Sequence, residues 1–205
     1  MRRQILKVAT ASVAALLWSA SAHAALVFFS DRAAFEAAAG GGLSFEGFET
    51  PWTSAPSVAF SGFTLSETSG NPNSIISVGS FPSVGMPTQG SRWAGYQDNG
   101  SSVATFAFAS PINALGVDYG VAASVTVDVG GDIITSFSVT AGVPVFFGVI
   151  DTSGTFTTIS FAAGGGKPDA GFDALSFGTK VPEPGTLALL GLGLAGLAAS
   201  RRRKK

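Results

Sequence analysis

Short apolar segments separated by turn residues run through most of this chain, and this pattern restricts the fold more than any other feature. Between residues 25 and 180, stretches rich in Val, Ile, Thr and Phe alternate with Gly, Asn and Pro about every ten residues. Because each strand is short and each turn returns the chain to a neighbouring strand, the pattern predicts a mainly β fold, an antiparallel β-sandwich. We expect roughly nine or ten strands in a jelly-roll-like arrangement.

The strands are predicted from their β-branched and aromatic residues. Eight of them cover 58–65, 101–108, 112–119, 125–129, 132–134, 144–150, 155–161 and 172–177. The clearest pair is the hairpin at 125–134, where valine occupies every second position of the first strand and Gly130 and Gly131 can form a two-residue turn. Residues 68–100 show the least regular pattern, so we expect long loops there.

One short helix is expected near the start of the body, over residues 30–39. Ser30 is a suitable N-cap, Asp31 favours the positive end of the helix dipole, and Gly40 supplies a stop. We find no second helical region between this helix and residue 180.

The chain has no cysteine, and its single histidine, His23, lies in a segment that we expect to be removed. Without Cys or His, the mature chain cannot build a Ser-His-Asp triad, a Cys-His pair or a typical zinc site. Carboxylates alone would allow a glycan hydrolase, but no motif selects one pair of them from the 12 acidic residues of the body. We therefore expect no enzymatic activity.

Charge is distributed unevenly along the chain. The formal net charge is −1, yet residues 25–180 carry 12 acidic and 4 basic residues, and most basic residues lie at the two ends. An acidic body repels phosphates, so nucleic acid is not an expected partner.

The first 24 residues have the three parts of a secretory signal peptide. A basic start precedes an apolar stretch at 8–18, and small residues follow. Ala22 and Ala24 form an A-x-A site, so signal peptidase is expected to cleave before Ala25. The alternative is an uncleaved anchor helix, which is disfavoured because the apolar run is short for a bilayer.

The last 25 residues form a tail of three parts. These are the proline motif at 181–185 with Val181, Pro182, Glu183 and Pro184, the uncharged segment 186–200, and the basic cluster of Arg201, Arg202, Arg203, Lys204 and Lys205. As a transmembrane helix, the uncharged segment would be about 22 Å long, short of a hydrocarbon core of about 30 Å. The consecutive cations resist translocation, which predicts a cytoplasmic C-terminus and a body outside the inner membrane.

In the order and position of its parts, this tail resembles the PEP-CTERM sorting signal of Gram-negative bacteria, which some ice-binding proteins also carry. The resemblance implies that an exosortase reads the Pro-Glu-Pro motif, removes the helix and transfers the body to the cell surface or to an extracellular polysaccharide matrix. The alternative is a plain single-pass anchor with an incidental proline linker. The expected division is a signal peptide (1–24), an acidic β-sandwich ectodomain (25–180) and a sorting tail (181–205).

Parts of the body resemble jelly-roll modules related to carbohydrate-binding domains. They are the opening segments 29–35 and 43–49 and the closing segment 171–178. Where such modules often have Gly-Ile-Asp-Asn in the last strand, this chain keeps Asp173 but has Ala174 in place of the Asn. The resemblance implies a structural calcium ion held by Glu46 or Glu49 together with Asp173. The alternative is that these acids are solvated at strand edges.

A polar, Gly-rich stretch around Trp93 and Tyr96 is the candidate ligand site. Sugar binding needs exposed flat aromatic rings, and the nearby Asp98 and Asn99 could hydrogen-bond a polar ligand. The alternative is that both rings cover one end of the sandwich as part of its core.

Taken together, the two ends and the all-β body predict an exported, exosortase-processed surface or matrix protein with a non-catalytic body. The second hypothesis is a carbohydrate-binding module that recognises matrix polysaccharide. A calcium-dependent glycan hydrolase is the third.

Overall fold

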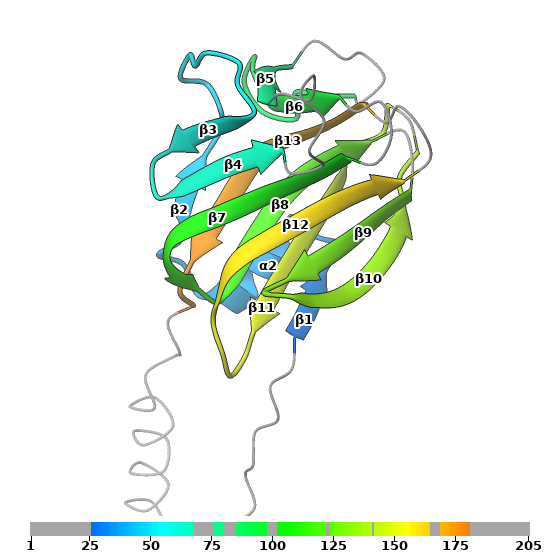
Figure 1. The fold of residues 1–205 in the computed structure, drawn as a ribbon. Helices are drawn as coiled ribbons and strands as arrows, with labels where there is room; N and C mark the ends of the chain where they lie inside the picture. The colour runs from blue at the N-terminus through cyan, green and yellow to red at the C-terminus, as the bar shows by residue number, and fades with distance from the viewer. Residues whose placement is uncertain are drawn as a thin grey trace, which may run out of the picture.

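The computed structural model describes residues 26–67, 76–79, 85–97, 102–121, 124–140, 142–164 and 169–180. They form two antiparallel sheets packed face to face and one short helix (Figure 1). The expected mainly β sandwich with one helix is thereby confirmed. Among these residues, no helix has the length and apolar character needed to cross a membrane. The predicted signal peptide and the whole predicted sorting tail lie outside the described residues.

The two sheets are of similar size. Sheet A has the order β1-β11-β8-β13-β6-β5, with β2 paired to β13, and sheet B has the order β10-β9-β12-β7-β4-β3. The strands of sheet A are β1 (Leu26–Phe29), β2 (Ser44–Glu46), β5 (Ile76–Val78), β6 (Ala94–Gln97), β8 (Ala114–Val121), β11 (Val145–Asp151) and β13 (Asp169–Gly178). Those of sheet B are β3 (Ser57–Phe60), β4 (Phe63–Glu67), β7 (Ser102–Ile112), β9 (Ser124–Val129), β10 (Asp132–Ser138) and β12 (Phe156–Gly164).

Aromatic rings fill much of the space between the sheets. The rings of Phe106 and Phe172 lie 4.8 Å apart, and Phe161 packs against Phe172 at 5.1 Å. Tyr96 and Tyr119 are fully buried among them, and their hydroxyl groups lie 3.1 Å apart, so each satisfies the other's polar atom. The same burial raises the pKa of Tyr119. Buried residues of both sheets therefore form one hydrophobic core.

The predicted hairpin is confirmed as β9 and β10. Its turn residues Gly130 and Gly131 have φ angles of 66° and 103°, a combination that suits glycine in a two-residue turn. Asp128 stabilises the turn by accepting a hydrogen bond from the backbone N–H of Gly131 at 2.8 Å.

The prediction of a single strand at 58–65 is wrong. The segment is a hairpin in which β3 pairs with β4, and Phe60 is the register partner of Phe63. Gly62, with a φ of 89°, allows the chain to reverse between them. The segment expected to be mostly loop also contributes the short strands β5 and β6, which is why the strands outnumber the expectation.

The helix forms where it was expected but begins one residue later. Its N-cap is Asp31 and not Ser30, because the Asp31 carboxylate accepts a hydrogen bond from the backbone N–H of Ala34 at 2.8 Å. The helix, α2 (Arg32–Ala39), ends at Gly40 in the left-handed conformation, as predicted.

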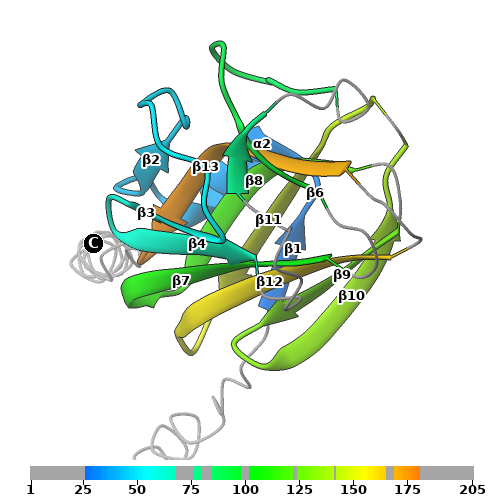
Figure 2. The same ribbon diagram turned by 45° about the horizontal axis from the view of Figure 1, so that its top comes forward.

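Helix α2 lies on the outer face of sheet A, away from sheet B (Figure 2). Phe35 is fully buried at this contact, where Gly116 and Gly148 are register partners on β8 and β11. A Cβ atom at Gly116 would lie 2.6 Å from the ring of Phe35, so the absence of a side chain makes room for the helix. The position of α2 brings Arg32 over the middle of sheet A.

Candidate functional site

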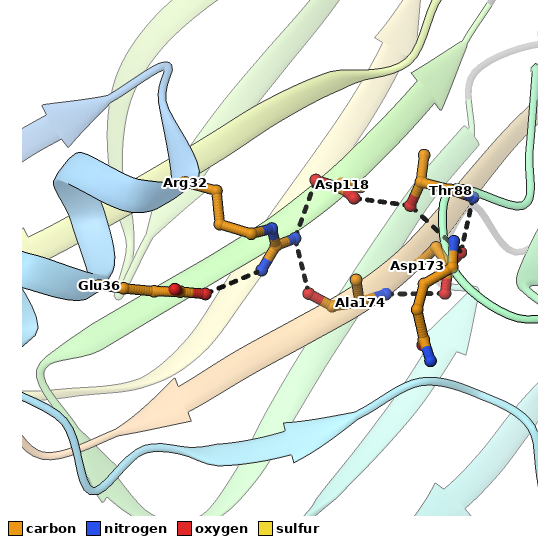
Figure 3. Close-up of polar contacts among 7 residues, drawn as sticks. Arg32, Glu36, Thr88, Asp118, Asp173 and Ala174 are labelled. Carbon is orange, nitrogen blue, oxygen red and sulfur yellow. Dashed lines mark hydrogen bonds and ion pairs between the residues drawn. The ribbon is translucent and has the colours of Figure 1, made fainter.

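Polar side chains gather on the outer face of sheet A, between α2 and the loop that precedes β6 (Figure 3). We call this group, Arg32, Thr88, Asp118, Asp173 and Ala174, the Arg32 network. Arg32 donates through Nη2 to Oδ1 of Asp118 at 2.8 Å and to the carbonyl oxygen of Ala174 at 2.9 Å. Its guanidinium also lies 4.6 Å above the ring of Phe146. One cation thus ties the helix to two central strands.

Asp173 fixes the loop to the sheet. Its Oδ2 accepts hydrogen bonds from the backbone N–H groups of Thr88 and Gln89, both at 2.8 Å, and its Oδ1 accepts from the N–H of Ala174 at 2.7 Å. The hydroxyl group of Thr88 also lies 2.6 Å from Oδ2 of Asp118. Asp173 is fully buried, and this burial raises its pKa although the backbone N–H groups act in the opposite direction.

Ala174 follows Asp173 in a strained conformation. Its φ is 48°, in the left-handed region that Asn and Gly tolerate better than Ala, and the β13–β8 register shifts between Asp173 and Ser176. The irregularity turns the carbonyl of Ala174 toward Arg32. Ala174 thus stands in a left-handed conformation at the position where the pattern noted above has Asn.

Glu49 holds the other end of the same loop. Its Oε1 accepts from the backbone N–H groups of Ser91 and Arg92 at 2.9 and 3.0 Å, and its Oε2 accepts from the Ser91 hydroxyl at 3.1 Å. The N–H of Arg92, followed by that of Ser91, lowers the pKa of Glu49. Glu46 accepts a hydrogen bond from the N–H of Phe48 at 2.7 Å.

Glu46, Glu49 and Asp173 are the acids of the calcium hypothesis, and each of them accepts hydrogen bonds from backbone N–H groups. In the described part of the chain, no group of three Asp, Glu, His or Cys side chains is arranged to hold a metal ion. These carboxylates hold nearby backbone N–H groups, and a calcium ion held by Glu46 or Glu49 together with Asp173 stays a prediction.

The two aromatic rings of the candidate ligand site, Trp93 and Tyr96, are buried. Tyr96 is fully buried and Trp93 is only 4% exposed, so the core alternative describes both rings. A Cβ atom at Gly171 would lie 2.3 Å from the ring of Trp93, and one at Gly79 would lie 1.8 Å from it. The indole ring packs where these glycines leave space. Asp98 and Asn99 lie outside the described residues.

Two features of this surface were missed from the sequence. Asp118 faces Asp173 because β8 pairs with β13, Thr88 joins them from the loop that precedes β6, and no local motif marks either approach. The second feature is Phe45 on β2, which is 57% exposed and was not among the candidate ligand contacts.

The C-terminal segment is matched by a protein-family model. The model, described as PEP-CTERM protein-sorting motif, covers residues 180–204. This chain carries a PEP-CTERM sorting motif. The motif implies export and sorting to the cell surface, and it begins two residues after the last strand of the sandwich ends at Gly178.

The β-sandwich body resembles solved carbohydrate-binding modules. A variant of the family 29 module CBM29-2 is 11% identical with a TM-score of 0.42, covering 67% of this chain and 95% of that one. The CBM36-1 domain of a multidomain xylanase from the hindgut metagenome of Trinervitermes trinervoides is 18% identical with a TM-score of 0.31, covering 57% and 96%. These distant likenesses carry no argument about a ligand. No curated protein matches the sequence.

Proposed function

We propose that this chain is an exported surface or matrix protein whose tail is processed by an exosortase and whose delivered part is a non-catalytic β-sandwich. The observation that carries the proposal is the sorting motif directly behind the last strand. Because β13 ends at Gly178 and the motif match starts at residue 180, cleavage at the motif would remove no strand of the sandwich.

The N-terminal end supports the same division. Strand β1 begins at Leu26, so removal of residues 1–24 by signal peptidase would also leave every described strand intact. Between the two processing events, the segment 186–200 would hold the chain in the inner membrane with the cationic end at 201–205 in the cytoplasm. The body would then pass to the surface or to the polysaccharide matrix.

Substitution within the motif tests this route. We expect the double variant Pro182→Ala/Pro184→Ala, produced in the native host, to keep its tail and to remain in the inner-membrane fraction. The matched control is Thr179→Ala, an exposed position just ahead of the motif, which should be sorted as the unmodified chain is. Normal release of the double variant would contradict processing at the motif.

Binding of matrix polysaccharide is a second candidate, and the exposed ring of Phe45 favours it. Gln89 is exposed nearby, and a Cβ at Gly47 would lie 2.4 Å from the Gln89 Oε1 and 3.3 Å from the Phe45 ring, so amide and ring border the same small space. An aromatic ring beside an amide suits a sugar, which stacks on the ring and hydrogen-bonds the amide.

Affinity electrophoresis in gels that contain the host's own polysaccharide tests this candidate. We expect retardation of the unmodified protein and at least a tenfold weaker interaction for Phe45→Ala. Val143→Ala removes another exposed apolar side chain, 55% exposed, and should behave as the unmodified protein does. Equal retardation of all three proteins, or of none, would exclude Phe45 as a glycan contact.

A further inference from the structure

Asn113 holds the chain at the point where the sorting motif begins. Its backbone N–H donates to the carbonyl oxygen of Gly178 at 3.0 Å, and its side-chain Oδ1 accepts a hydrogen bond from the backbone N–H of Lys180. We call these two hydrogen bonds the Asn113 clamp. Lys180 is also the first residue that the sorting-motif model matches, so the clamp ends where the motif starts.

The clamp is built by the assembled sandwich. Asn113 is the single residue between Ile112, the end of β7, and Ala114, the start of β8, and Ala114 is the register partner of Gly178. This connection lies at the end of the sandwich where β13 also ends (Figure 1). The carbonyl oxygen of Asn113 accepts from the backbone N–H of Asp151, the last residue of β11, at 2.7 Å. Because several strands hold Asn113, its Oδ1 meets the departing chain at a fixed place.

Cleavage at the motif needs the same stretch of backbone. The proposed new C-terminus lies between Val181 and Pro184, so Lys180 stands one to four residues ahead of it. A bound peptide that adopts an extended form is held through its backbone N–H and C=O groups. An N–H group of Lys180 that donates to Asn113 cannot donate to the enzyme with good geometry at the same time.

The bond that breaks is one peptide bond at the motif. Its carbonyl carbon passes to a nucleophile of the enzyme, and its nitrogen takes the proton that the nucleophile gives up and leaves with the tail as an amine. The Asn113 clamp takes no part in this exchange. It acts only on whether the chain ahead of the bond is free to be bound.

We propose that the Asn113 clamp slows the processing of the tail, because the clamp has to open before the enzyme can bind the chain ahead of the motif. This control rests on the proposed function, since it concerns the same cleavage. When opening and closing are fast relative to cleavage, the rate follows the population of the open form. One hydrogen bond of ordinary strength changes such a population by roughly fivefold.

Removal of the side-chain half of the clamp tests the proposal. We expect full-length Asn113→Ala, pulse-labelled in the native host, to lose its tail roughly three to ten times faster than the unmodified chain. Asn113→Asp keeps an oxygen that can accept from the N–H of Lys180, so it should be processed no faster than the unmodified chain. The fraction of tail-bearing chain over time is the measurement.

Ile159→Val separates opening of the clamp from a general loss of stability. Ile159 is fully buried on β12, so the substitution weakens the core by an amount comparable to the loss of one hydrogen bond but leaves both bonds of the clamp in place. We expect its tail to be removed at the unmodified rate.

An insertion tests the same proposal without changing Asn113. Roughly six Gly and Ser residues placed between Lys180 and Val181 give the motif a free flexible flank. We expect this insertion alone to speed processing at least threefold, and Asn113→Ala to have no further effect in the chain that carries it.

Equal or slower processing of Asn113→Ala, equal acceleration by Ile159→Val, an insertion without effect on the rate, or an effect of Asn113→Ala that persists after the insertion would overturn the proposal. In each of these cases the tail is still removed, so the sorting route stands. Retention of the tail by the unmodified chain would instead contradict the proposed function, and the clamp proposal would fall with it.

Discussion

At the scale of single residues, two carboxylates hold the same loop but respond to pH in opposite directions. Burial raises the pKa of Asp173 above its ordinary value of 3.8, whereas backbone N–H groups lower the pKa of Glu49 below 4.5. A raised pKa contributes stability below the unfolded-state value, and that contribution is lost as pH rises through the folded-state pKa. A lowered pKa contributes stability above the unfolded-state value, and that contribution is lost as pH falls through the folded-state pKa.

The two substitutions Asp173→Asn and Glu49→Gln should therefore show opposite pH profiles. We expect the loss of unfolding free energy caused by Asp173→Asn to shrink as pH rises from about 3.5 to 7, and the loss caused by Glu49→Gln to grow over that range. Denaturant unfolding at a series of pH values measures both. Parallel slopes for the two variants would contradict the assigned environments.

Ala174 carries backbone strain that a smaller residue can relieve. Because its φ is 48°, we expect Ala174→Gly to raise the free energy of unfolding by up to about 1 kcal/mol. Ala170→Gly is the control on the same strand, because Ala170 is fully buried and does not have a positive φ. We expect this substitution to lower the free energy of unfolding by about 1 kcal/mol. Thermal or denaturant unfolding measures the stability of both variants. If Ala174→Gly were destabilised as much as Ala170→Gly, the backbone at Ala174 would not be strained.

At the scale of elements, α2 depends on missing side chains in the sheet beneath it. A Cβ at Gly116 would approach Phe35 to 2.6 Å and Phe146 to 2.8 Å. We expect Gly116→Ala to cost about 1–3 kcal/mol of unfolding free energy by forcing the helix outward. In a Phe35→Ala background the same substitution should cost at least about 1 kcal/mol less, which a double-mutant cycle measures. Additive costs would mean that the helix does not rest on these glycines.

Strands and turns that are marked by nearby residues were predicted well, whereas contacts between segments far apart in the sequence were not. The hairpin at Gly130 and Gly131 was predicted because its turn chemistry and valine alternation lie within a few residues. The split of 58–65 was missed because the apolar residues on both sides of Ser61-Gly62 were read as one strand, although this dipeptide is a turn signal. The Arg32 network was missed for a different reason, since its members come from segments up to 142 positions apart.

At the scale of the whole molecule, the sequence is most informative where the chain is not part of the sandwich. The sorting motif is a short linear signal, so it was recognisable without a fold and is matched at residues 180–204. The character of the body's surface depends on which aromatic rings the fold buries. Trp93 was therefore a candidate ligand contact with burial as the alternative, and it is buried, whereas Phe45 was overlooked and is exposed.

The central claim is that the sandwich is delivered by processing at both ends. Intact mass of the protein from its native host, measured separately in membrane and extracellular fractions, tests it most directly. The account predicts a released or surface species that begins at Ala25 and ends at the motif between Val181 and Pro184, with any attached group seen as added mass. A species that retains Arg201–Lys205 and stays in the inner membrane would contradict it.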